Sequence, residues 1–196
     1  MHSPFVFHFI LDVLNNRQNF LPPSHIEKIR EKALTDKTPL LIEDMGAGSR
    51  TKATKMRTVA QLASSAVKPK KFSYLFYRLV KKYKPQTIIE LGTSLGITSA
   101  YLAAAAPTSR VTTIEGSSAV QQVASKNFSD LGLKNIDSLC GNFDDLLPGL
   151  LAQPDSVDLA YIDGNHRYGP TIDYFHQMLA KATNQSIMIF DDIHWS

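Results

Sequence analysis

The sequence lacks most of the features that would mark it as a secreted, membrane or nucleic-acid-binding protein. Its 196 residues include one cysteine, Cys140, so no internal disulfide can form, which fits a reducing compartment. No apolar run is long enough to cross a membrane, and residues 5–14 lack the basic flank of a signal peptide. The net charge of +3 is too small to indicate nucleic-acid binding. We therefore expect a cytoplasmic chain with no nucleic-acid or membrane partner, folded as one domain or as one domain with an N-terminal appendage.

The most informative stretch, residues 87–106, has the pattern of a strand, a glycine turn and a helix. A short apolar run at 88–91 is typical of a buried parallel strand. Gly92 and Gly96 bracket a tight turn, and apolar residues at helical spacing follow over 97–106. Such a unit presents backbone N–H groups and a helix N-terminus to a ligand.

Two acidic residues narrow the kind of ligand that this turn would bind. The spacing Gly-x-x-x-Gly differs from the dinucleotide fingerprint, and Glu90 just before it would repel a pyrophosphate. Glu115 ends the next apolar run, at the position that holds ribose hydroxyls in this kind of fold. The alternative role for Glu115 is a helix cap beside Ser117.

Strand and helix patterns alternate from residue 85 to the end of the chain. This alternation predicts an α/β fold with a doubly wound, mostly parallel sheet, in which the carboxyl ends of the strands line one crevice. The expected strands after the first are 111–115, 136–140, 157–162 and 186–190, and the expected helices are 97–106, 117–131 and 170–182.

From Thr87 onward the chain resembles the class I S-adenosylmethionine-dependent methyltransferases, most closely the small catechol-type O-methyltransferases. The likeness rests on the Glu-x-Gly-x-x-x-Gly turn and on the strand-end motifs that follow in order. It implies a Rossmann-like fold and methyl transfer from S-adenosylmethionine to an oxygen of a small-molecule acceptor. The cofactor-binding residues that it implies are Glu90, Gly92, Thr93, Ser94, Gly96, Glu115, Gly116, Asn142, Phe143 and Asp163. For Phe143 a place in the core is an equal alternative.

The family's sheet usually continues with a sixth strand and an antiparallel seventh strand. We expect both strands to be missing here, which would make 186–190 an edge strand that another chain could cover.

The same resemblance implies a catalytic and metal-binding cluster near the end of the chain. Asp163 and His166 are the candidate catalytic residues, with His166 as a general base. Asp163, Asp191 and Asp192 are candidate ligands of Mg²⁺ or Ca²⁺, because only Arg167 supplies a nearby positive charge in the sequence. The alternatives are aspartates that cap turns and a structural histidine. His194 and Trp195 are candidates for the wall of an acceptor pocket.

Residues 1–84 are predicted to form an N-terminal helical extension with a lid-like basic loop, and residues 85–196 the cofactor-binding core. A helix from Ser3 to about Asn15 is apolar around most of its circumference, so we expect it to be buried against the core or a second subunit in a homodimer.

Further along this extension, Ser24 and Glu27 predict a capping box that opens a second helix. Residues 44–48 form a rival glycine turn, but the basic segment 50–57 after it lacks the apolar face of a phosphate-binding helix. We interpret 50–57 as an exposed loop, with a lid or a contact to an acidic substrate as the alternative.

Three other functions stay open from the sequence. One is a nucleotide-dependent oxidoreductase on a similar sheet, although the third glycine of its fingerprint is missing. Another is a hydroxylase-like relative that shares the Asp-Gly-Asn-His turn at 163–166. The last is a catalytically silent cofactor-binding module.

Overall fold

A computed structural model describes residues 3–16, 21–44, 53–153 and 155–193. Within these residues a five-stranded parallel sheet has the strand order β5-β4-β3-β6-β7, which confirms the predicted α/β doubly wound fold. The last strand lies at one edge of this sheet, as predicted. The strands are β3 (Thr87–Leu91), β4 (Arg110–Glu115), β5 (Ile136–Cys140), β6 (Leu159–Ile162) and β7 (Ile187–Phe190).

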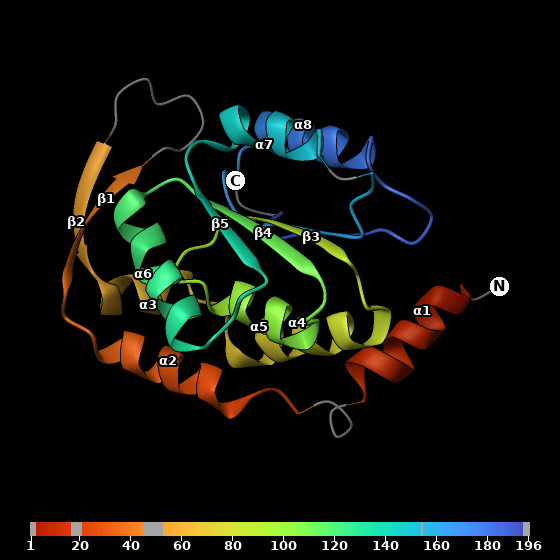
Figure 1. Ribbon diagram of the computed structural model, residues 1–196, viewed down its shortest axis with the longest axis horizontal. Helices are drawn as coiled ribbons and strands as arrows, with labels where there is room; N and C mark the ends of the chain where they lie inside the picture. The colour runs from red at the N-terminus through yellow and green to blue at the C-terminus, as the bar shows by residue number, and fades with distance from the viewer. Residues whose placement is uncertain (1–2, 17–20, 45–52, 154, 194–196) are drawn as a thin grey trace.

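Helices cover both faces of the sheet (Figure 1). On one face α4 (Lys70–Tyr83), α5 (Ile97–Ala105) and α6 (Ser118–Asp130) share a core with Ile88 and Leu159. On the other face α7 (Phe143–Leu151) and α8 (Tyr168–Leu179) share a core with Ile89 and Ile162. Successive residues of one strand thus enter opposite cores, because side chains alternate across a pleated sheet. This two-sided burial explains why the central strands β3 and β6 are mostly apolar.

Helix α7 was not predicted from the sequence. Pro148 lies inside this helix and breaks the local pattern, since proline is disfavoured in helix interiors. The helix begins at a side-chain cap, where Asn142 Oδ1 accepts a hydrogen bond of 3.1 Å from the Asp144 amide. Burial of Leu147, Leu150 and Leu151 against the sheet supplies the tertiary stabilisation that outweighs the proline.

The basic segment is not the loop that the sequence predicts. Strands β1 (Pro39–Asp44) and β2 (Ala53–Thr58) form an antiparallel hairpin, so the loop prediction is wrong for 53–57. Helical spacing was the wrong pattern to look for, because the alternation of a strand has a period of two. The rival glycine turn at 45–48 lies outside the described residues.

The N-terminal helix is also less buried than predicted. It consists of α1 (Pro4–Phe9) and a π-helical turn, η1 (Ile10–Leu14), which packs on α4. Val13 is fully buried and its carbonyl accepts a hydrogen bond of 2.7 Å from Arg78 Nε. Phe5 and Phe7 stay more than half exposed. The predicted second subunit therefore stays a prediction.

The capping box predicted at Ser24 is wrong, whereas the next helix does have one. Ser24 is the first residue of α2 (Ser24–Thr35), and the residue before it makes no side-chain cap bond. Glu27 instead accepts hydrogen bonds from Arg30 and from the buried hydroxyl of Tyr101. Helix α3 (Val59–Ala66) begins with a capping box between Thr58 and Gln61. Among the described residues, every helix is too short or too polar to cross a membrane.

Candidate active site

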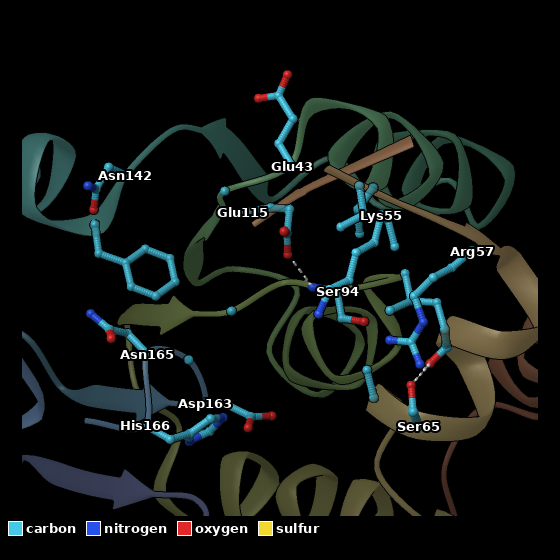
Figure 2. Close-up of a pocket in the computed structure, with 18 of the residues that line it drawn as sticks. Glu43, Lys55, Arg57, Ser65, Ser94, Glu115, Asn142, Asp163, Asn165 and His166 are labelled. Carbon is cyan, nitrogen blue, oxygen red and sulfur yellow. Dashed lines mark hydrogen bonds between the residues drawn. The ribbon is translucent and has the colours of Figure 1, made fainter. Parts of the chain in front are cut away.

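A cavity of about 580 Å³ opens where the strands of the parallel sheet reach their carboxyl ends (Figure 2). One wall, which we call the sheet wall, consists of the turns that follow the strands. The opposite wall, which we call the hairpin wall, comes from β1, β2 and α3. The sheet wall includes Gly92, Ser94, Glu115, Gly116, Asn142, Phe143, Asp163, Asn165, His166 and Asp192, and the hairpin wall includes Ile42, Lys55, Arg57 and Ser65.

The turn after β3 passes very close to the turn after β6. A Cβ atom on Gly92 would lie 2.1 Å from the carbonyl oxygen of Asp163, and Gly92 has a φ of +102°, so only glycine fits there. Ser94 also has a left-handed φ of 49°, and its hydroxyl is buried without a hydrogen-bond partner in the described residues. This close approach brings the backbone of both turns to the cavity.

Glu115 is oriented by backbone amides at the end of β4. Its Oε2 accepts a hydrogen bond of 2.8 Å from the Ser94 amide, and its Oε1 accepts one of 3.1 Å from the Ser117 amide. Burial raises the pKa of this carboxyl, although the amide hydrogen bonds oppose the rise. Glu115 thus accepts a hydrogen bond from the residue that precedes α6 and also lines the cavity, and its two predicted roles stay predictions.

The structure places Glu90 behind the cavity wall. The side chain is fully buried, and its Oε2 accepts hydrogen bonds from Ser99 and, at 2.7 Å, from Thr113. Its Oε1 has no partner among the described residues. Burial raises the pKa of Glu90 to about 8, so the carboxyl is mostly protonated at neutral pH. This placement does not support the predicted direct contact between Glu90 and a cofactor.

Thr93 and Gly96 are likewise absent from the cavity lining. Thr93 is buried and its hydroxyl shares a hydrogen bond of 2.6 Å with Thr113. Gly96 precedes α5 with a φ of +77°, and a Cβ atom there would lie 2.5 Å from the Phe128 ring. Both residues therefore support the turn from behind the cavity lining, and their contact with a cofactor stays a prediction.

A lysine that was not predicted from the sequence lies among the candidate metal ligands. Lys68, between α3 and α4, forms an ion pair of 3.2 Å with Asp163 and another with Asp191. The hydroxyl of Tyr161 donates to both aspartates, at 2.8 and 3.2 Å. The premise that this cluster lacks a positive charge beyond Arg167 is therefore wrong. Lys68 lies far from the aspartates in the sequence, so no local pattern could have indicated it.

The set of side chains that could hold a cation also differs from the predicted set. Asp163, His166 and Asp192 each offer one ligand atom, and these atoms lie within 4.8 Å of one another. Asp191 is not a member of this group and pairs with Lys68 instead. Burial raises the pKa of Asp163, and the nearby Lys68 opposes that rise.

Asn142 and Phe143 lie together at the start of α7 and line the cavity. The Phe143 ring packs edge-on against Tyr174, with 5.9 Å between the ring centroids. A Cβ atom on Gly164 would lie 2.8 Å from the Phe143 ring. Phe143 therefore belongs to the core on one side and to the cavity on the other. His194 and Trp195, the candidates for an acceptor wall, lie outside the described residues.

The fold and the site together define a class of protein. A parallel sheet of this order, with a glycine turn after β3 and an amide-bound acid after β4, is the arrangement of Rossmann-like nucleotide-binding enzymes. The family model described as "Methyltransferase domain" matches residues 89–193, more than half of the chain, and the chain belongs to this family. The class I methyltransferase resemblance drawn from the motifs is thereby confirmed.

Solved structures share the fold at low sequence identity. The O-methyltransferase TomG from Streptomyces achromogenes, in complex with SAM, is 19% identical with a TM-score of 0.64; the match covers 99% of this chain and 76% of that one. The SAH-bound Podospora anserina methyltransferase PaMTH1 is 16% identical with a TM-score of 0.68, over 98% and 73% of the two chains. The O-methyltransferase from Bacillus cereus in complex with SAH is 18% identical with a TM-score of 0.68, over 93% and 72%. No curated protein matches this chain in sequence.

Proposed function

We propose that this chain binds S-adenosylmethionine in the cavity and transfers its methyl group to an oxygen of a small-molecule acceptor. The observation that carries the proposal is the Glu115 carboxylate, which two backbone amides orient at the end of β4, in the wall of the cavity. A carboxylate held in this way offers paired acceptors to a ribose diol. Membership of the methyltransferase domain family supports the same reaction. An oxygen acceptor is favoured because TomG and the Bacillus cereus protein are O-methyltransferases.

The residues around Glu115 fit the rest of this cofactor. Gly92 leaves backbone open to the cavity, and the unpartnered hydroxyl of Ser94 is available to a polar group nearby. Asn142 and Phe143 offer an amide and a ring face to the adenine. S-adenosylmethionine supplies a methyl group on a sulfonium centre, which an oxygen nucleophile attacks in line. The chain's own contribution is mainly to position the two reactants.

Asp163 and His166 are proposed to handle the acceptor hydroxyl. Both line the cavity, and each offers a ligand or hydrogen-bonding atom within 4.8 Å of the other (Figure 2). The imidazole of His166 is suited to take the proton that the hydroxyl loses. Asp163, held by Lys68 and Tyr161, is suited to accept a hydrogen bond from the hydroxyl and so orient it.

We also propose that a divalent cation binds beside Asp163 and His166 in the cavity. Asp163, His166 and Asp192 are the residues that would hold Mg²⁺ or Ca²⁺, and two carboxylates are suitable ligands for these ions. Lys68 already neutralises part of this charge, so the cation would share Asp163 with the lysine. When bound, such an ion would supply Lewis-acid chemistry to the acceptor hydroxyls, which suits a vicinal diol.

Calorimetry and a transfer assay test the proposal. We expect S-adenosylhomocysteine, but not NAD⁺, to bind and to raise the melting temperature. Glu115→Ala should weaken this binding by at least tenfold, because hydrogen bonds to a charged group are lost. Asp145→Ala, which removes an exposed acid outside the cavity, is the matched control. Transfer of a radiolabelled methyl group to a panel of diols, with and without a chelator, then tests the acceptor and the cation.

Each alternative has its own outcome. Binding of NAD⁺ in place of S-adenosylhomocysteine would favour an oxidoreductase. Cofactor binding without transfer to any acceptor would favour a silent module or a hydroxylase-like relative. If the chelator leaves methyl transfer unchanged, the reaction needs no cation, and Asp163 acts as a hydrogen-bond acceptor.

A further inference from the structure

We propose that Lys55 and Arg57, on the hairpin wall, form an anion subsite that binds a carboxylate of a ligand in the cavity. This inference rests on the proposed function, and it identifies the chemistry of the ligand group that faces the hairpin. Two ligands could supply the carboxylate. One is the amino-acid end of the cofactor, and the other is an acidic acceptor.

The two cations lie on the same face of one strand. In the hairpin register Lys55 faces Ile42 and Arg57 faces Leu40, whereas Met56 faces Leu41. Residues two apart on a strand are about 6.8 Å apart along it, a spacing that two long basic side chains can span to reach one carboxylate. Lys55 and Arg57 both line the cavity.

The two faces of the hairpin differ in what they carry. The face with Leu41 and Met56 is directed to solvent, and these side chains are 52% and 64% exposed. The face with the two cations borders the cavity, where Leu40 is buried and Ile42 is half-buried. On this face Arg57 is half-buried and Lys55 keeps contact with solvent. Both cations therefore border the space that a ligand in the cavity would occupy.

The acids and the two cations lie on different walls of the cavity, except for Glu43, which lines the cavity from β1. Glu115, Asp163 and Asp192 lie on the sheet wall. Lys68 is the third basic residue of the lining, and its charge is already paired with Asp163 and Asp191. Within the described ranges no ion pair engages Lys55 or Arg57. An anionic group would thus be repelled by the acids and attracted to the hairpin.

Glu43 is the acid that could compete for these cations. It also borders the cavity, but its carboxylate points away from Lys55 in Figure 2. Arg57 also lines a second depression, beside α3. Lys55 and Arg57 are therefore best tested one at a time.

The first arm of the test asks whether the carboxylate belongs to the cofactor. S-adenosylhomocysteine carries the amino acid, whereas 5′-methylthioadenosine lacks it, and calorimetry compares their binding to wild type, Lys55→Gln and Arg57→Gln. If the cofactor is the source, each variant weakens binding of S-adenosylhomocysteine by about tenfold and leaves binding of 5′-methylthioadenosine unchanged. Arg57→Lys, which keeps the charge, should retain part of the affinity.

The second arm asks whether the carboxylate belongs to the acceptor. With the protein saturated by S-adenosylhomocysteine, we compare binding of 3,4-dihydroxybenzoate with that of the neutral 3,4-dihydroxybenzyl alcohol. If the acceptor is the source, wild type prefers the benzoate by about tenfold, and Lys55→Gln and Arg57→Gln lose this preference.

Two controls separate a subsite from a general effect of charge or folding. Lys134→Gln removes an exposed lysine outside the cavity, and Met56→Gln changes the outer face of the same strand. The anion subsite is wrong if Lys55→Gln and Arg57→Gln behave like the control variants both in the comparison of the two cofactor analogues and in the comparison of the benzoate with the benzyl alcohol. Binding of S-adenosylhomocysteine by wild type would still support the proposed function in that case. If wild type binds no S-adenosylhomocysteine, the proposed function fails, and the benzoate comparison on the free protein decides the subsite.

Discussion

The two walls of the cavity are built in different ways, and they differ in what holds each functional group. The sheet wall is positioned by backbone, because its central turns follow β3 and β6, which are buried on both faces. Gly92 and the amide of Ser94 act there through the main chain. The hairpin wall is a separate two-stranded sheet that offers long, basic side chains. We therefore expect changes at the backbone contacts of the sheet wall to disrupt the fold, and changes to the basic side chains of the hairpin wall to alter affinity.

The largest effect should come from Gly92→Ala. Its Cβ atom would lie 2.1 Å from a backbone oxygen, and its φ of +102° is unfavourable for alanine. We expect a loss of about 3 kcal/mol or more in the free energy of unfolding, and loss of S-adenosylhomocysteine binding. Gly132→Ala is the matched control, because Gly132 also has a left-handed φ, of +67°, but open space around it. It should cost about 1 kcal/mol. Urea unfolding of both variants measures the difference, and equal losses would contradict the close contact.

Glu90→Gln tests whether the buried Glu90 carboxyl, behind the sheet wall, makes the free energy of unfolding depend on pH. The folded chain keeps the Glu90 proton up to a pKa of about 8, whereas the unfolded chain releases it near 4.5. Between these values the folded state binds the extra proton, so stability falls as the pH rises, by at most about 1.4 kcal/mol per pH unit. Glutamine resembles the protonated acid and does not titrate. We expect Glu90→Gln to flatten this fall between about pH 5 and pH 8, as measured by urea unfolding. Parallel pH profiles for the two chains would show that Glu90 is already ionised in the folded state.

The smallest expected effect on stability comes from removing the hydroxyl that precedes a helix beside each wall. The Thr58 hydroxyl caps α3 beside the hairpin by accepting a hydrogen bond of 3.2 Å from the Gln61 amide. Ser117 precedes α6 beside the sheet wall, but its hydroxyl makes no cap bond and has no partner in the described residues. Thr58→Ala should therefore cost about 1 kcal/mol, and Ser117→Ala clearly less. Thermal unfolding of the two variants checks the order, and a larger loss for Ser117→Ala would reverse it.

The prediction from sequence was most complete for segments whose local pattern of apolar residues directly reflects their place in the fold. The strand predicted at 136–140 matches the observed bounds of β5, and the apolar run at 88–91 lies within β3, whose side chains are buried on both faces of the sheet. Glu115 and Asp163 could be placed at one edge from the sequence pattern, since parallel strands in a doubly wound sheet end on the same side. Helix α7 was missed because its stability comes from contacts rather than from propensity.

Local pattern in the sequence specifies the order of strands and helices, the glycine turn and the acids at the strand ends. These follow from periodicity and from the conformations that glycine alone adopts easily. Long-range packing, by contrast, puts Glu90 behind the wall, pairs Lys68 with Asp163 and Asp191, and turns Lys55 and Arg57 toward the cavity. Each of these depends on which segments meet in space. Burial and charge pairing between distant segments leave no local pattern in the sequence, since the partners are brought together only when the chain folds.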